Sequence, residues 1–157
     1  MNILDFLVPG SVALHYTATD SKDVISHLGR LLFDAGYVRG TFVEAALDRE
    51  SRLPTGLPLS GDVNAAIPHT EVEHVIKPGL AMATLAAPVT FQNMVAPDEA
   101  VPCSLVFVMA LDQPKAQIEM LQEIAGVLQD AEIIKRLMSA NDYEDVRASF
   151  STDRSLA

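Results

Sequence analysis

One histidine in this chain follows a short apolar run and a proline, in the order Ala66-Ile67-Pro68-His69. Residues 63–67 are apolar except for Asn64, which is typical of a short β-strand. Pro68 fixes its own φ and favours an extended conformation for the residue before it. His69 is therefore predicted to lie where a strand ends. A neutral imidazole in such a place is a good nucleophile near pH 7, because its ordinary pKa lies close to that value.

Three segments together carry a family resemblance. Leu47-Asp48-Arg49-Glu50, Leu53-Pro54-Thr55-Gly56 and Ala66-Ile67-Pro68-His69 resemble the enzyme IIA domains of the fructose/mannitol class, which belong to the bacterial phosphoenolpyruvate:sugar phosphotransferase system. The Pro-Thr-Gly segment and the later His74 are most similar to the galactitol-specific type. The resemblance covers about residues 20 to 150, and the stretch from the arginine to the histidine is its specific part.

The resemblance implies both a fold and a reaction. The implied fold is α/β, with a single mixed β-sheet sandwiched by helices on both faces. In that family the histidine after Ile-Pro, here His69, accepts a phosphoryl group from phospho-HPr and passes it to a cysteine of enzyme IIB. Enzyme IIB and the membrane enzyme IIC then choose and carry the sugar, which for the galactitol type is a sugar alcohol. The chain is thus expected to be a phosphotransferase component with a phosphohistidine intermediate.

Phosphoryl transfer to histidine needs a neutral ring nitrogen, donors for the phosphoryl oxygens and a surface where two proteins meet. Arg49 is the candidate clamp, because guanidinium can bind phosphate oxygens in a bidentate fork. Thr55 offers a hydroxyl from the Pro-Thr-Gly loop. Alternatively, Arg49 is a solvated charge at a helix end, and Thr55 is an ordinary turn residue. Glu50 or Glu71 could orient the second ring nitrogen of His69, and the sequence does not choose between them.

Two further side chains are candidates for helping His69. His74 either stabilises the phosphohistidine or packs as an ordinary loop histidine. In many members of the resembling family, a second histidine opens the helix after the last long strand, whereas this chain has Gln117 at that place. This departure puts a two-histidine site in doubt there. Gln117 could still donate a hydrogen bond, or His74 could substitute from the other side.

Other chemistries find less support in the sequence. Residues 69–74 are rich in histidine and glutamate, but Pro68 and the spacing of the two histidines fit no standard zinc helix, so no metal is expected. No Gly-rich phosphate loop indicates a nucleotide cofactor, and no Gly-x-Ser-x-Gly elbow indicates a hydrolase. His15 is assigned to an early loop, and His27 to the exposed flank of the first predicted helix.

The composition excludes some partners. The chain has 157 residues and a formal net charge of −10, which argues against nucleic acid as a partner because phosphate binding needs clustered Lys and Arg. The acidity fits either a protein partner with a positive patch or plain solubility. No apolar run approaches the roughly 18 residues that span a membrane, and residues 1–9 lack the basic start of a signal peptide. Direct membrane insertion is not expected.

Cys103 is the only cysteine, so no internal disulfide is possible, and a cytoplasmic location is expected. It lies within the apolar run 101–107, which favours a buried and inert thiol. A phosphate-accepting cysteine of enzyme IIB is therefore not evident, and the chain is interpreted as a IIA protein alone.

The periodicity of apolar residues predicts helices, then strands, then helices. Predicted helices lie at 21–36, 41–50, 114–128, 131–140 and 141–150. Predicted strands lie at 63–67, 79–86, 89–91 and 101–111. The last of these is nearly all apolar, as a central strand covered on both faces would be. One domain, 1–157, is predicted, with a core from about residue 3 to 150 and a polar tail at 151–157.

Local signals predict where several elements begin and end. Thr41 and Glu44 have the form of a capping box at a helix start. Pro114 suits a first helical position, and Asn141 is predicted to cap the last helix. Pro88 is predicted to break the strands on either side of it.

The sequence is thus interpreted as a phosphocarrier that uses His69. Three alternatives stay open. The first is a regulatory IIA homologue, whose phosphorylation state signals to other proteins. The second is a non-catalytic binding module that uses His69 only structurally. The third is a metal-dependent hydrolase.

Overall fold

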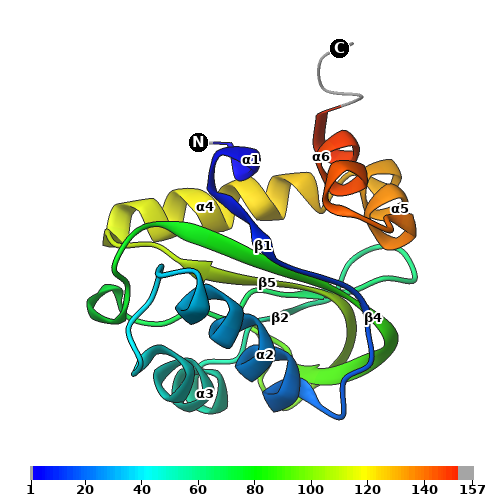
Figure 1. Ribbon diagram of the computed structural model, residues 1–157. Helices are drawn as coiled ribbons and strands as arrows, with labels where there is room; N and C mark the ends of the chain where they lie inside the picture. Colours follow the sequence, from blue (N-terminus) through cyan, green and yellow to red (C-terminus); the bar gives the residue numbers. More distant parts are fainter. Residues whose placement is uncertain (1, 152–157) are drawn as a thin grey trace.

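A five-stranded mixed sheet in the order β1-β4-β5-β3-β2 forms the middle layer of the computed structural model, which describes residues 2–151 (Figure 1). The strands are β1 (Leu7–Tyr16), β2 (Gly56–Leu57), β3 (Ala65–Ala66), β4 (Gly79–Gln92) and β5 (Ala100–Ala110). β1 runs parallel to β4 and β3 parallel to β5, whereas the β4–β5 and β2–β3 pairs are antiparallel. The two long strands β4 and β5 therefore lie in the interior of the sheet.

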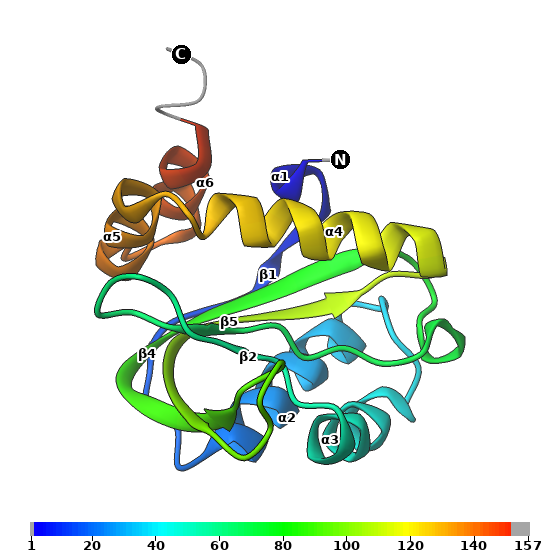
Figure 2. The same cartoon turned by 180° about the vertical axis from the view of Figure 1, so that it is seen from behind.

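Helices cover both faces of this sheet, as Figures 1 and 2 show from opposite sides. The first face carries α2 (Ser21–Asp34) and α3 (Phe42–Arg52). The opposite face carries α1 (Ile3–Phe6), α4 (Pro114–Val127), α5 (Ala131–Ser139) and α6 (Tyr143–Ser151). The prediction of a single mixed sheet between two helical layers is confirmed.

β5 supplies core residues to both layers. Val106 and Val108 belong to the core under α2 and α3, while Phe107 and Met109 belong to the core under α4. All four side chains are almost completely buried. Because burial of such a side chain stabilises the fold by about 1.5–3 kcal/mol, an apolar residue is favoured at each position of a strand that is covered on both faces. The predicted central strand is confirmed.

β4 corrects one prediction. Pro88 does not separate two strands, because Gly79–Gln92 is one strand that pairs with β5 on both sides of a register shift between Thr84 and Val89. Pro88 lies in this shift and is exposed. A residue in a β-bulge donates no ladder hydrogen bond, so proline is tolerated there.

The sequence pattern does not predict β1 (Leu7–Tyr16), and it places His15 in a loop. His15 instead lies near the end of this edge strand with φ 53°, and its backbone N–H donates to Thr84 Oγ1. The pairing of β1 with β4 shifts register between Leu7 and Val12, around the exposed Pro9 and Gly10. These interruptions remove the regular alternation by which a strand is recognised.

Two of the predicted helix caps are wrong. Thr41 precedes α3 but makes no capping hydrogen bond, and its hydroxyl lies 2.8 Å from His74 Nδ1 instead. At α6, the side chain of Asp142, not of Asn141, accepts the Asp145 backbone N–H at 2.8 Å. Pro114 does begin α4, as predicted.

The remaining predictions on the fold have mixed outcomes. Cys103 is fully buried, as predicted, and burial raises its pKa to about 12, which keeps the thiol protonated and unreactive. No helix within residues 2–151 is both long and apolar enough to cross a bilayer. The predicted tail at 151–157 lies, except for Ser151, outside the described residues.

We expect Asp142→Ala to lower the free energy of unfolding by about 0.5–2 kcal/mol, because it removes the acceptor for a backbone N–H in the first turn of α6. Chemical denaturation followed by circular dichroism measures this loss. Asn141→Ala is the matched control and should stay within about 0.5 kcal/mol of the native protein. A larger loss in Asn141→Ala than in Asp142→Ala would show that the adjacent residue is the cap.

Candidate functional site

His69 lies just beyond β3, at a position where the chain still follows β5. Ala66 is opposite Val106, and His69 is opposite Met109 in the same parallel register. The Met109 N–H donates to the Pro68 carbonyl at 3.0 Å, which fixes the backbone immediately before the histidine. The prediction that His69 follows a strand is confirmed, and the pairing explains how a loop histidine is held in place.

A backbone carbonyl sets the tautomer of His69. The Nδ1 atom lies 2.9 Å from the Ile67 carbonyl oxygen. A carbonyl oxygen only accepts hydrogen bonds, so in the neutral ring Nδ1 carries the proton and Nε2 keeps a free lone pair. The hypothesis that Glu50 or Glu71 binds the second ring nitrogen directly is wrong, because Glu50 binds Thr55 and Glu71 binds Arg49.

The surroundings of His69 favour its neutral form. Burial lowers the pKa of His69 most strongly, and the positive charge of Arg49 lowers it further. The hydrogen bond to Ile67 and the negative charge of Glu71 act in the opposite direction without cancelling the shift. The ring is therefore unprotonated at neutral pH and its Nε2 atom is nucleophilic.

Arg49 reaches this site from the last turn of α3. Its Nη1 atom donates to Glu71 Oε2 at 2.7 Å, in an ion pair whose side chains are 26% and 47% exposed. The Nε atom of Arg49 is buried and has no hydrogen-bond partner within residues 2–151. A buried donor without a partner is costly, so an anion that reaches this guanidinium would satisfy it.

Thr55 is 2% exposed and belongs to a hydrogen-bond network that includes the half-buried Glu50. Its hydroxyl donates to Glu50 Oε1 at 2.8 Å, and its backbone N–H donates to Glu50 Oε2 at 2.9 Å. The same hydroxyl accepts the Ile67 N–H at 3.2 Å. Burial raises the pKa of Glu50, and the two hydrogen bonds from Thr55 oppose this effect. The structure therefore connects Thr55 to the backbone before His69, and its contact with a phosphoryl group stays a prediction.

His74 ends a short 3-10 helix, η1 (Val72–His74), between β3 and β4. Its Nδ1 atom lies 2.8 Å from Thr41 Oγ1, and its carbonyl accepts the Arg39 N–H at 2.9 Å. These bonds connect the segment after His69 with the start of α3. No hydrogen bond joins His74 to His69 in the described part of the chain, so a role of His74 toward the phosphoryl group stays a prediction.

Gln117 comes to the site from the first turns of α4. Its Nε2 atom donates to the carbonyl of Thr70, the residue after His69, at 2.6 Å. Sequence reasoning identified this residue only through its departure from the family pattern. The structure shows that it holds the backbone on the far side of the histidine from Pro68.

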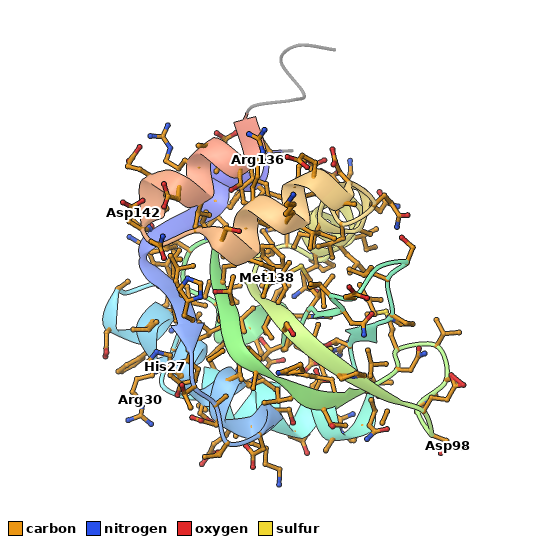
Figure 3. All side chains as sticks on the ribbon, turned by 90° about the vertical axis from the view of Figure 1, so that its right-hand side faces the viewer. His27, Arg30, Asp98, Arg136, Met138 and Asp142 are labelled. Atoms are coloured by element: carbon orange, nitrogen blue, oxygen red, sulfur yellow. The ribbon has the colours of Figure 1, made fainter. Side chains whose placement is uncertain are left out.

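The other histidines lie outside this arrangement. His27 stacks on Tyr16 with ring centroids 4.4 Å apart, and Figure 3 shows it on the surface of α2 together with Arg30. His15 belongs to β1. Within residues 2–151, no group of three or more His, Cys, Asp and Glu side chains could hold a metal ion.

Comparisons with known proteins agree on one family. The family described as phosphoenolpyruvate-dependent sugar phosphotransferase system, EIIA 2, matches residues 5–152. The galactitol-specific EIIA component of Escherichia coli K12 is 30% identical over 120 residues, which cover 76% of this chain and 79% of that protein.

Two solved structures have the same fold. One is enzyme IIA-mannitol of Escherichia coli in its complex with phosphorylated enzyme IIB-mannitol, with a TM-score of 0.76 and 26% identity over 92% of this chain and 96% of that chain. The other is the nitrogen regulatory protein IIA-Ntr of Neisseria meningitidis, with a TM-score of 0.71 and 25% identity over 94% of this chain and 97% of that chain.

We expect the nuclear magnetic resonance titration of His69 to have its midpoint below the ordinary value of 6.5. Arg49→Gln should raise this midpoint and Glu71→Gln should lower it, because each removes one of the opposing charges. The unfolded chain binds this proton at higher pH than the folded one, so His69 should cost stability as the pH falls below about 6.5. A midpoint above 6.5 in the native protein would contradict this account.

Proposed function

This chain belongs to the EIIA type 2 family of the phosphoenolpyruvate-dependent sugar phosphotransferase system, and on that premise we propose that it carries a phosphoryl group on His69. One observation carries the assignment to this residue. The Ile67 carbonyl holds the proton on Nδ1, which leaves Nε2 as a free nucleophile on a ring that the positive charge of Arg49 also reaches.

In the proposed reaction, the Nε2 lone pair of His69 attacks the phosphorus atom of phospho-HPr. A phosphorus–nitrogen bond forms, and the bond between phosphorus and the donor atom of HPr breaks, with its electron pair returning to that atom. The Nδ1 proton stays on the hydrogen bond to Ile67. Arg49 neutralises the charge on the phosphoryl oxygens, for which Glu71 must share or release the guanidinium.

The second transfer reverses this step with a different acceptor. A thiolate of enzyme IIB attacks the phosphorus, the phosphorus–nitrogen bond breaks, and its electron pair returns to Nε2. Support for this partner comes from the similar IIA structure, which is bound to phosphorylated enzyme IIB. Similarity to a galactitol-specific EIIA component makes a sugar alcohol, carried by a membrane enzyme IIC, the proposed final acceptor. Because this chemistry needs no membrane segment in this chain, we propose that it takes place in the cytoplasm.

A second candidate function is regulatory. It is favoured by the structural similarity to the nitrogen regulatory protein IIA-Ntr. The two roles differ in the fate of the phosphoryl group, since a transport protein passes it rapidly to enzyme IIB. Chase of the labelled protein with enzyme IIB from the same genome distinguishes them, because a regulatory protein retains its label.

We expect His69→Gln to abolish labelling by phosphoenolpyruvate, enzyme I and HPr, while the circular dichroism spectrum stays native. The substitution removes the only proposed nucleophile at a partly buried position. The label on the native protein should be labile in acid and stable in base, as expected of a phosphohistidine. His15→Ala and His27→Ala are the controls and should be labelled normally. Undiminished labelling of His69→Gln would place the acceptor elsewhere.

We expect Arg49→Ala to slow labelling about ten- to a hundredfold, which corresponds to the roughly 1.5–3 kcal/mol of a charge-assisted hydrogen bond. Arg49→Lys should restore part of the rate, because an ammonium lacks the planar fork. Arg52→Ala is the matched control, since it removes the same charge from the same helical turn and breaks only an exposed ion pair with Asp48. Quenched-flow labelling at fixed HPr concentration measures all three. Equal slowing by Arg49→Ala and Arg52→Ala would reduce the effect to net charge.

A further inference from the structure

The segment before His69 contains an incomplete strand pair. β2 and β3 are antiparallel, with Gly56 opposite Ala66, so the next pair along the ladder is Thr55 opposite Ile67. The Ile67 N–H donates to the Thr55 carbonyl at 3.3 Å, which is one half of a hydrogen-bonded antiparallel pair. Regular pairing would complete it with a bond from the Thr55 N–H to the Ile67 carbonyl.

A carboxylate prevents the second half of that pair. The Thr55 N–H donates at 2.9 Å to Glu50 Oε2, and the Thr55 hydroxyl donates at 2.8 Å to Glu50 Oε1. Both donors of this residue are therefore directed toward α3 and away from the Ile67 carbonyl. That carbonyl lies instead 2.9 Å from Nδ1 of His69. The β2–β3 pairing therefore stops at Ile67, whose carbonyl oxygen is the acceptor for Nδ1 of His69.

We propose that Glu50 is the positioning residue that sets the tautomer of His69: by binding both donors of Thr55 it ends the β2–β3 pairing and reserves the Ile67 carbonyl for the Nδ1–H. Glu50 acts at a distance, through Thr55 and Ile67, and makes no hydrogen bond to the ring. The relevance to phosphoryl transfer rests on the proposed function, whereas the effect on the tautomer does not.

The tautomer of the His69 ring decides whether Nε2 can act as a nucleophile. If the Thr55 N–H were free to bind the Ile67 carbonyl, that oxygen would have a second donor, and its hydrogen bond to the Nδ1–H would weaken. The neutral ring could then carry its proton on Nε2, and a protonated Nε2 has no lone pair for the phosphorus. An enzyme histidine held in the wrong tautomer can lose up to about 10⁴ in rate.

The tautomer of His69 is measurable without any partner protein. In the native protein, the ¹⁵N chemical shifts of the ring should report Nδ1–H, and scalar coupling across the Thr55 N–H hydrogen bond should reach the side-chain carboxyl carbon of Glu50. Coupling to the Ile67 carbonyl carbon instead would overturn the proposal in the unmodified protein. This measurement does not depend on whether any variant folds.

Glu50→Met tests the role of the carboxylate, because it keeps a similar side-chain volume and removes both acceptors. We expect Nε2–H to become the major neutral tautomer and labelling by phospho-HPr to slow about tenfold or more. Glu50→Gln retains one acceptor oxygen for the Thr55 N–H and should keep mostly Nδ1–H. Asp48→Ala, which removes an exposed carboxylate from the same helix, should leave the tautomer unchanged.

The outcomes separate this proposal from the phosphocarrier function. An unchanged Nδ1–H signal in Glu50→Met, or an equal shift in Asp48→Ala, overturns the role of Glu50 and leaves His69 as the proposed acceptor. A native protein with the expected tautomer that takes no label from phospho-HPr overturns the proposed function and leaves the role of Glu50 in place.

Discussion

The parallel pairing of residues 65–69 with β5 is the constraint on which the site depends. β5 is buried along most of its length and is held by core residues on both faces. A segment that stays in register with it as far as Met109 inherits its rigidity. The pairing directs the Pro68 carbonyl toward β5, and the alternation of a strand then turns the backbone of Ile67 the opposite way. This alternation aims the Ile67 carbonyl away from β5, on the side where it meets Nδ1 of His69.

The site is built around the backbone of a short segment. Thr55 and Glu50 hold it from the side of α3, and Gln117 holds the Thr70 carbonyl from the side of α4. The two helical layers therefore meet the histidine from opposite faces of the sheet. Of the charged side chains nearby, Arg49 and Glu71 are bound to each other and leave the ring nitrogen Nε2 free. Such an arrangement presents one nucleophile and one cation on a rigid frame, which suits a transfer with little covalent chemistry for the protein to perform.

The sequence predicts this fold well where one physical signal dominates and poorly where two compete. β5 and α2 follow directly from apolar runs and helical spacing. β1 cannot be predicted from the sequence because Pro9 and Gly10 interrupt its alternation of apolar and polar residues. Pro88 predicts a break between two strands, whereas in the structure it lies in a bulge of one continuous strand. His69 and Arg49 are predicted as site residues from local sequence and resemblance. The acceptor for Nδ1 cannot be predicted in this way, because it is a backbone carbonyl and every residue has one. The hydrogen bonds from Thr55 to Glu50 interrupt a strand pair that can be seen only in the three-dimensional structure.

The two edge strands of the sheet, β1 and β2, are short or irregular, and this affects whether another molecule can pair with them. A long, regular edge strand is a template for pairing with another molecule. Here β2 is only two residues long, and β1 changes register twice along its length, with Pro9 unable to donate a hydrogen bond. Neither edge offers an uninterrupted row of donors and acceptors for β-sheet extension. Both edges are therefore poor templates for β-sheet extension by another molecule.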